Sequence, residues 1–182
     1  MNEYVDIWTL GSYDYILPTL DPHGTNISGY CSNYEPHTTN SKATPYNTQD
    51  ALNFYIDQET IPGSKIHIGV PLYATEFHET DGVGLKCTSI NHVGLDLIPP
   101  SLFVATHHDL IAHAAYTYNE TVKIMTSFEC IDTIKFIADV VKARGLGGLT
   151  WIEAVGQRDG TLLRHVSDDL TLSLLNLTTA GL

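Results

Sequence analysis

Aromatic and carboxylate side chains gather at the ends of three apolar runs in this chain. The runs are Val5–Tyr15 (VDIWTLGSYDY), Lys65–Phe77 (KIHIGVPLYATEF) and Gly147–Glu153 (GGLTWIE). The side chains concerned are Tyr13, Asp14, Tyr15, Tyr73, Trp151 and Glu153. Phenol and carboxylate groups exchange hydrogen bonds with hydroxyl groups, and aromatic faces pack on apolar surfaces. Together these groups suit a large, partly apolar ligand that is rich in hydroxyl groups.

Each apolar run is predicted to contain a buried strand of about five to eight residues. The runs are almost continuously apolar, which is typical of strands in a parallel sheet that is covered on both faces. In α/β sheets and barrels the residues that contact ligands lie at the carboxyl ends of such strands. We therefore expect the side chains at the ends of the three runs to share one face of the molecule.

Hydrophobic spacing predicts three helices outside these runs. The first begins near Thr48 and ends before Pro62, the second ends at Gly145, and the last spans residues 161–175. Their inward-facing positions recur every three or four residues, as in an amphipathic helix. These positions are Leu52, Tyr55 and Ile56 in the first, Ile134, Ile137, Ala138 and Val141 in the second, and Leu162, Val166, Leu170 and Leu174 in the last.

Residues 78–128 do not follow a helical pattern. Glycines and prolines interrupt this stretch, and β-like pieces follow at residues 114–118 and 122–127. The pattern predicts a small α+β insertion at residues 78–128, within one domain that spans residues 1–182.

The charge and hydropathy of the chain exclude two classes of function. The net charge is −12 at pH 7, and the acidic residues are spread along the 182 residues. Such a surface repels phosphates, so we expect no nucleic-acid partner. No apolar stretch reaches the roughly 20 residues that a membrane span needs. We therefore also expect no membrane partner.

Histidine and cysteine spacing predicts no metal site and no cofactor. His107 and His108 are adjacent, and none of the nine histidines has the spacing of a known metal motif. The three cysteines are Cys31, Cys87 and Cys130. Two alternatives stand for them: one disulfide with a leftover thiol, or three buried free thiols, and the second is favoured.

Three segments carry a resemblance to fungal chitinases of glycoside hydrolase family 18 (class V type). Residues 1–15 (MNEYVDIWTLGSYDY) resemble the sixth-strand segment of that family, typically M-D-x-Y-x-D-x-W-N-L-M-A-Y-D-Y. Residues 63–77 (GSKIHIGVPLYATEF) and 144–153 (RGLGGLTWIE) resemble its seventh and eighth strands. The resemblance spans nearly the whole chain in the order of the family. It implies an α/β fold, a partial TIM (β/α)8 barrel with strands six to eight and the insertion.

The resemblance also implies a groove for chitin or chitooligosaccharides and the family reaction, hydrolysis of β-1,4-linked N-acetylglucosamine. In that family the acetamido oxygen of the sugar itself attacks the anomeric carbon, an exception to the usual pair of carboxylates. By position, Tyr13 would donate a hydrogen bond to the acetamido oxygen and Asp14 would contact the same sugar. These are supporting catalytic roles. The substrate-binding residues would be Gly11, Ser12, Tyr13, Asp14, Tyr73, Trp151 and Ile152.

Several of these residues depart from the family pattern. Gly11-Ser12 stand for Met-Ala, Ala74-Thr75 for Gly-Arg, and Phe128-Glu129 for Tyr-Asp. Ile152 stands at the place of the tryptophan that forms the floor of the central sugar subsite. Simpler roles also exist for the candidates: a hydrogen-bonded strand end for Tyr13 and Asp14, and core packing for Tyr73 and Trp151.

The general acid of the family is missing from the sequence. That glutamate ends the pattern Asp-x-x-Asp-x-Asp-x-Glu after strand four, and no aspartate here begins such a series. Because general acid–base catalysis contributes roughly 10²–10⁴-fold, we expect the chain to be inactive alone. Three hypotheses follow: a chitinase segment that needs a complementary N-terminal half-barrel, a non-catalytic chitin- or glycan-binding remnant, and an orphan interaction fragment. The exposed strand edges of a half-barrel would favour docking of the other half, or self-association.

The expected localisation depends on which signal is followed. The family resemblance implies an extracellular protein, and three Asn-x-Ser/Thr triplets agree with that. Residues 1–8 (MNEYVDIW) lack the basic region of a secretory signal, so the chain as translated is expected to be cytoplasmic.

Overall fold

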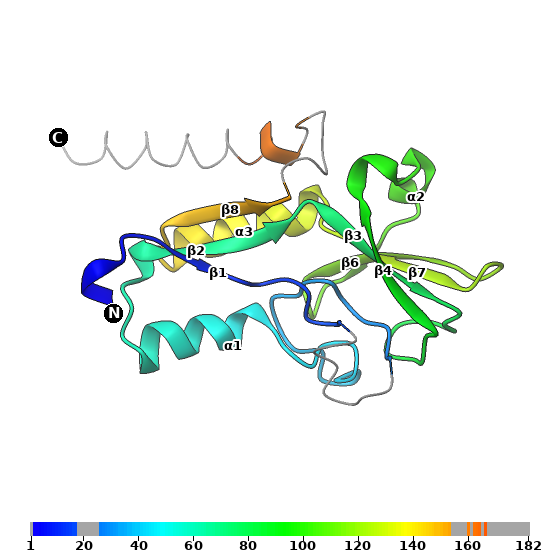
Figure 1. The fold of residues 1–182 in the computed structure, drawn as a ribbon, viewed down its shortest axis with the longest axis horizontal. Coiled ribbons are helices and arrows are strands. Elements are labelled where there is room, and N and C mark those ends of the chain that lie inside the picture. The colour runs from blue at the N-terminus through cyan, green and yellow to red at the C-terminus, as the bar shows by residue number, and fades with distance from the viewer. Residues whose placement is uncertain (1, 18–25, 154–159, 161, 165, 167–182) are drawn as a thin grey trace.

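The strands that the structure describes form two sheets that lie end to end (Figure 1). The computed structural model describes residues 2–17, 26–153, 160, 162–164 and 166. The first sheet is parallel, with the order β1-β2-β8, and its strands are β1 (Trp8–Leu10), β2 (Ile66–Pro71) and β8 (Gly148–Ile152). Leu10 pairs with Ile68 across β1 and β2, and Ile68 pairs with Leu149 across β2 and β8. The carboxyl ends of the three strands therefore lie side by side and point toward the second sheet (Figure 1).

The second sheet is antiparallel and lies between β2 and β8 in the sequence. Its order is β4-β3-β7-β6-β5. The strands are β3 (Tyr73–His78), β4 (Ser89–Gly94), β5 (His107–Asp109), β6 (Ala114–Asn119) and β7 (Ile124–Ser127). The predicted β-like pieces at 114–118 and 122–127 correspond to β6 and β7.

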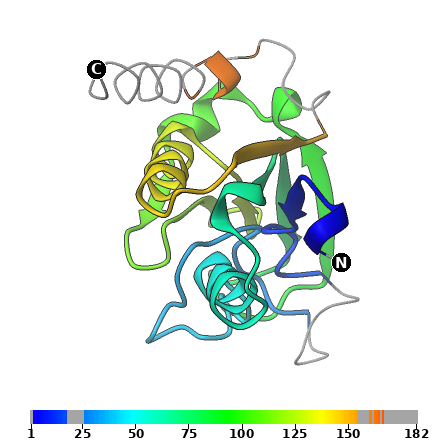
Figure 2. The ribbon, with the colours of Figure 1, turned by 90° about the vertical axis from the view of Figure 1, so that its left-hand side faces the viewer.

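Two longer helices cover one side of the parallel sheet. Helix α1 (Thr48–Asn53) continues as a π-helical segment, Phe54–Gln58, and α3 spans Ile131–Ala143. Figure 2, which looks along both helices, shows them on the same side of β2. Among the described residues, the remaining helical pieces are α2 (Pro100–Val104), 3₁₀ turns at Asn2–Tyr4, Gly63–Lys65 and Leu95–Leu97, and the helical residues 162–164 and 166.

Local sequence explains where α1 and α3 begin and end. The Asn47 side chain accepts a hydrogen bond from the Asp50 N–H at 2.8 Å and so caps α1. Helix α3 is followed by Gly145 with φ +60°, a conformation that ends helices and that glycine adopts without strain. The inward residues predicted for this helix, Ile134, Ile137, Ala138 and Val141, are all buried.

Among the described residues, the core consists of three hydrophobic clusters, and α3 contributes to two of them. Ile134 and Ala138 pack with Val70 and Leu72 at the carboxyl end of β2. Ile137, Val140 and Val141 pack with Leu52 of α1 and with Ile66 and Ile68 of β2. The third cluster lies under the antiparallel sheet and includes Ile16, Tyr30, Phe77 and Met125.

One predicted strand is confirmed and another needs correction. The run Lys65–Phe77 contains β2, whose six residues fall in the predicted range of five to eight, and β3 then begins in the other sheet at Tyr73. Leu72 joins them: it is fully buried, and its N–H still bonds to the Ile152 carbonyl of β8 at 3.0 Å. Both halves of the run are buried, so apolarity does not mark the change of sheet. The run Val5–Tyr15 yields only the short strand β1, which pairs with β2 alone among the described residues.

The three cysteines are free, as the favoured alternative predicted. Cys31 and Cys87 are buried, whereas Cys130 is half-buried. Leu162 and Val166 are buried as expected for the last helix, but most of the predicted span 161–175 lies outside the described residues. A membrane-spanning helix, sufficiently long and apolar, is not found among the helices that the structure describes.

Candidate functional site

The loop after β1 places Tyr13 over the middle strand of the parallel sheet. A side chain at Gly69 of β2 would come within 2.8 Å of the Tyr13 ring and 2.7 Å of the Leu10 carbonyl oxygen. The absence of that side chain is what lets the ring approach the strand. Ser12 is buried, and its hydroxyl donates to the Gly69 carbonyl at 2.7 Å. Ser12 therefore holds the loop against β2.

Asp14, Tyr73 and His92 converge next to this loop. The Tyr73 hydroxyl donates to Asp14 Oδ1 at 2.6 Å, and His92 Nε2 lies 3.4 Å from the same oxygen. The Tyr73 and His92 rings stack with centroids 4.7 Å apart and an angle of 28° between their planes. Tyr73 begins β3 and His92 belongs to β4, so two strands of the second sheet meet the carboxyl end of the first.

The cluster presents an anionic acceptor beside an aromatic stack. Burial raises the pKa of the Tyr73 hydroxyl, as do the nearby Cys31 and Asp14, so this phenol stays a hydrogen-bond donor. The Asp14 side chain keeps 22% of its surface exposed. Asp14 has φ +57°, a left-handed conformation that aspartate tolerates better than most residues. This arrangement can accept hydrogen bonds from ligand hydroxyl or amide groups and pack against an apolar face.

The other predicted binding residues have different contacts. Trp151 on β8 is half-buried and packs against the core cluster of Val70 and Leu72. The Ile152 carbonyl is engaged by the Leu72 N–H. Gly11 is exposed and lines a pocket of about 120 Å³ between β1 and the α1 segment, together with Trp8 and Tyr55. Of the seven predicted substrate-binding residues, the structure thus gathers Tyr13, Asp14 and Tyr73, with Ser12 beneath them.

Two residues near the strand ends, His92 and Glu129, were not predicted as site residues. His92 belongs to a β-strand and carries no motif, so the sequence offers no signal for it. Glu129 is a buried carboxyl that accepts hydrogen bonds from the Ser32 and Thr133 hydroxyls. Burial raises its pKa, and these two hydrogen bonds oppose part of that rise. The only sequence signal for Glu129 was that it stands at the position of an aspartate in the family pattern.

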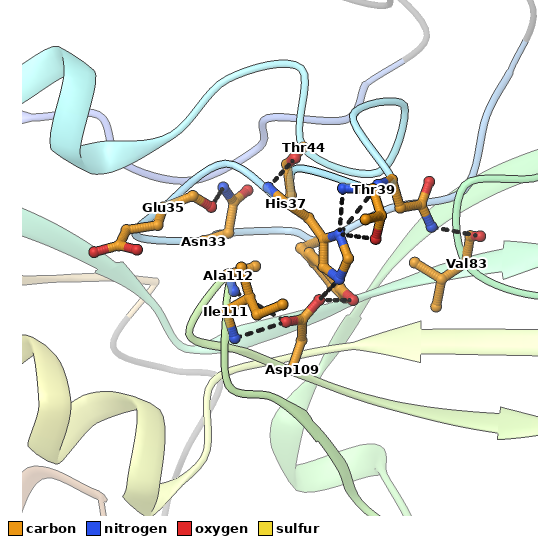
Figure 3. A network of polar contacts seen from close by, with 11 residues as sticks. Asn33, Glu35, His37, Thr39, Thr44, Val83, Asp109, Ile111 and Ala112 are labelled. Carbon is orange, nitrogen blue, oxygen red and sulfur yellow. Dashed lines mark hydrogen bonds and ion pairs between the residues drawn. The ribbon is translucent and has the colours of Figure 1, made fainter.

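A second polar network anchors the loop before α1 to the antiparallel sheet (Figure 3). Asp109 Oδ2 accepts a hydrogen bond from the Tyr30 hydroxyl at 2.7 Å and lies 3.4 Å from His37 Nε2. His37 Nδ1 accepts the Asn40 N–H at 3.1 Å, which leaves the ring proton on Nε2, facing Asp109. Asp109 Oδ1 accepts the Ile111 and Ala112 N–H groups. The network fixes the segment that carries Cys31 and Ser32, and hence the position of Ser32 beside Glu129.

The sequence of this chain matches a known protein family. The model of glycosyl hydrolases family 18 matches residues 1–154. The chain belongs to glycosyl hydrolases family 18. Among curated relatives, the chain is 29% identical over 164 residues to endochitinase 1 of Metarhizium robertsii, which covers 83% of this chain. It is 29% identical over 167 residues to chitinase 1 of Aphanocladium album, which covers 88% of this chain.

Solved chitinase structures share the fold of this family 18 chain. The catalytic domain of psychrophilic chitinase B from Arthrobacter TAD20 superposes with a TM-score of 0.74 at 20% identity, covering 91% of this chain and 38% of that one. A family 18 chitinase from Cycas revoluta in complex with (GlcNAc)3 gives 0.76 at 14% identity, covering 92% and 47%. The expected partial TIM barrel is therefore confirmed.

The family 18 chain corresponds to only part of its relatives. It spans 38% of the length of both the Metarhizium and the Aphanocladium protein. The pattern Asp-x-x-Asp-x-Asp-x-Glu is absent from its 182 residues.

Proposed function

We propose that this chain forms one wall of a chitooligosaccharide-binding cleft of the family 18 type. The cluster of Asp14, Tyr73 and His92 beside Tyr13 carries the proposal, because it lies at the carboxyl ends of barrel strands. That is where TIM barrels bind their ligands. The Cycas revoluta neighbour, whose fold the chain shares, is described in complex with (GlcNAc)3. This supports an N-acetylglucosamine oligomer as the ligand class.

Each residue of the cluster has a role that its contacts support. The Tyr13 hydroxyl would donate to the acetamido oxygen of the sugar as that group attacks the anomeric carbon. Asp14, held by the Tyr73 hydroxyl at 2.6 Å, would accept a hydrogen bond from the same acetamido group. The stacked Tyr73 and His92 rings would bound the cleft on the side of the second sheet.

We further propose that the chain does not hydrolyse chitin by itself. Two acidic residues near the strand ends are poor proton donors to a leaving group. Glu129 is buried and held by two hydroxyls, and Glu153 is exposed at the end of β8 with φ +59°. The family acid motif is absent from the sequence. An acid supplied by a complementary half-barrel would restore the reaction.

Ligand binding tests the cleft. Isothermal titration with tetra-N-acetylchitotetraose should show binding. Tyr73→Phe should weaken it by about ten- to a hundredfold, because Asp14 loses the hydrogen bond that positions it and a hydrogen bond to a charged group contributes roughly 1.5–3 kcal/mol. Tyr30→Phe is the matched control: it also removes a phenol that donates to a carboxylate, Asp109, but outside the cleft. Equal affinities for the two variants, or no binding to the parent chain, would refute the cleft.

Turnover tests the missing proton donor. The purified chain should release no fluorophore from a 4-methylumbelliferyl chitooligosaccharide at any pH, whereas a whole chitinase run in parallel does so. Measurable turnover that disappears in an Asp14→Ala variant would overturn the proposed inactivity and leave the binding cleft standing.

The partner proposed for this chain is a complementary half-barrel or a second copy. Among the described residues, β1 and β8 each pair with β2 alone and so leave one strand edge unpaired. Unpaired edges favour association. Sedimentation of the chain alone should show dimers, and addition of a half-barrel that bears the acid motif should convert them to a heterodimer. A purely monomeric chain in both experiments would remove this partner.

A further inference from the structure

We propose that His108, Cys130 and Asp132 form a Zn²⁺ site between the antiparallel sheet and helix α3. In the part of the chain that the structure describes, these three side chains lie close enough together to share one ion. One ligand atom from each lies within 4.8 Å of the other two. The sequence hides this group, because His108 is separated from the other two residues by more than twenty positions.

Two secondary-structure elements bring the three ligands together. His108 is held on β5 by pairing with Ala115 of β6. Cys130 immediately precedes α3, and its N–H bonds to Thr133 Oγ1 at 2.9 Å. Asp132 lies in the first turn of the helix, where Oδ2 is 3.8 Å from His108 Nε2. The backbone of all three residues is thus fixed, and only side-chain rotations are needed to close around an ion.

The donor set indicates which metal would bind. Imidazole, thiolate and carboxylate are the ligands of Zn²⁺, at about 2.0–2.3 Å. A tetrahedral ion with these bond lengths separates its ligand atoms by about 3.3–3.6 Å. The His108 and Asp132 atoms are 3.8 Å apart and all three ligand atoms lie within 4.8 Å of one another, so the side chains must move closer together around an ion. Mg²⁺ and Ca²⁺ prefer oxygen ligands alone, so the cysteine and the histidine disfavour them.

A pocket lined by two of the three ligands, His108 and Asp132, leaves room for a fourth ligand. It has a volume of about 60 Å³ and is lined by His108, Asp132, Thr133 and Phe136 among others. A pocket needs only about 10–15 Å³ to hold a water molecule. The side chains of His108 and Asp132 are 34% and 76% exposed. Three protein ligands and one water therefore describe the site, and an ion can reach it from solvent.

The local charges favour a cation on balance. The amino end of α3 carries a partial positive charge of roughly half a unit, which opposes a cation. The Asp132 carboxylate supplies one negative charge at the same place, the Cys130 thiol would supply a second on releasing its proton to the ion, and the chain as a whole carries −12. The bound ion would tie the edge strand β5 to the beginning of α3.

Cobalt substitution gives the direct test. Titration of the reduced, metal-free full chain with Co²⁺ should produce the near-ultraviolet charge-transfer band of cobalt–thiolate coordination at one ion per chain, and Zn²⁺ should abolish it. Cys130→Ser should remove the band without unfolding the chain, because serine is a good residue at the position before a helix. A band that persists in Cys130→Ser would mean that Cys31 or Cys87 binds the ion, which would overturn the site.

Matched neighbours separate this site from adventitious binding. His108→Ala should weaken Co²⁺ at least about tenfold, the loss that even an outer partner of a metal ligand causes. His107→Ala is its control, because adjacent strand residues face opposite sides and His107 instead stacks on Tyr116. Asp139→Asn serves in the same way for Asp132→Asn, since both aspartates are exposed on α3. Absence of the band, or equal Co²⁺ affinity in each variant and its control, would refute the proposal.

Discussion

Gly69 is the residue on which the position of Tyr13 depends. The Tyr13 ring and the Leu10 carbonyl both occupy space that any larger side chain on β2 would need. Gly11, three residues after Trp8 and close by in sequence, has no heavy atom within 4 Å of the place where a side chain would begin. A larger side chain would therefore clash at Gly69 but not at Gly11, although each glycine lies a few residues before a candidate site residue.

We predict that Gly69→Ala destabilises the chain by about 1–3 kcal/mol, the usual cost of overpacking a core. The same change should weaken binding of tetra-N-acetylchitotetraose, because Tyr13 must move off β2. Urea unfolding and titration calorimetry measure the two effects. Gly11→Ala is the control and should change the free energy of unfolding by less than about 0.5 kcal/mol. Equal effects of the two substitutions would contradict the packing seen around Gly69.

Glu129 gives a prediction about pH. Burial raises its pKa above the ordinary value of 4.5. The folded chain therefore binds this proton more tightly than the unfolded chain, and the free energy of unfolding falls as pH rises above 4.5. The neighbouring Cys31 thiol does not interfere, because burial raises its pKa to about 12.

Glu129→Gln removes this ionisation and should stabilise the chain relative to the parent. The gain should be absent below pH 4.5 and grow toward neutral pH, by at most about 1.4 kcal/mol per pH unit. Urea unfolding across a series of buffers measures it. Glu59→Gln, the same change at an exposed residue, should give no such trend. A gain that does not vary with pH would show that Glu129 is not a buried acid.

At the scale of elements, α3 is the helix that ties the two core clusters of the barrel segment together. Its residues alternate between the cluster at the carboxyl end of β2 and the cluster shared with α1. Residues three or four apart lie on neighbouring parts of one helix face, so a single stripe can serve both clusters. The stability of the candidate site therefore depends on α3, although α3 contributes no residue to the Asp14 cluster.

We predict that Ile134→Ala destabilises the chain by about 2–5 kcal/mol, because Ile134 is fully buried and its truncation leaves a cavity. Lys135→Ala, at the adjacent exposed position, should change stability by less than about 0.5 kcal/mol. Thermal and urea unfolding compare the two variants. Similar losses would mean that α3 does not pack on β2 as described.

The change of sheet at Leu72 positions the candidate site. Only Leu72 separates the end of β2 from the beginning of β3. Tyr73 therefore follows the carboxyl end of the parallel sheet directly and begins a strand of the antiparallel sheet. The strand pairing then brings His92 of β4 next to Tyr73. The pattern of Lys65–Phe77 predicted one strand of five to eight residues within the run but not the second strand in another sheet, since continuous apolarity is equally consistent with one long strand and with two strands in different sheets.

At the scale of the whole molecule, no cysteine cross-link contributes to stability. We predict three reactive thiols in the unfolded chain and slow alkylation of Cys130 alone in the folded chain, because Cys31 and Cys87 are buried. A reducing agent should leave the midpoint of urea unfolding unchanged. A disulfide would instead show as a loss of about 2–5 kcal/mol on reduction. Thiol counting and mass mapping of the alkylated residue check this expectation.

The sequence alone determined the family, the barrel strands β2 and β8, the helices α1 and α3 and the strand-end residues Tyr13, Asp14 and Tyr73. These features depend on local patterns: an apolar run, a helical stripe, a cap or a motif in a fixed order. Such patterns follow from the regular repeat of side-chain directions along a helix or a strand. They can therefore be recognised without knowing which residues pack against them.

Only the tertiary structure decided which distant residues meet. The pairing of His92 with Asp14, the burial of Glu129 beneath Ser32, and the proximity of His108 to Cys130 each join segments that are far apart in the chain. Trp151 and Gly11 show the reverse, since both lie near strand ends but outside the cluster. The physical reason is that burial and contact arise from the packing of sheets against helices, which no single segment specifies.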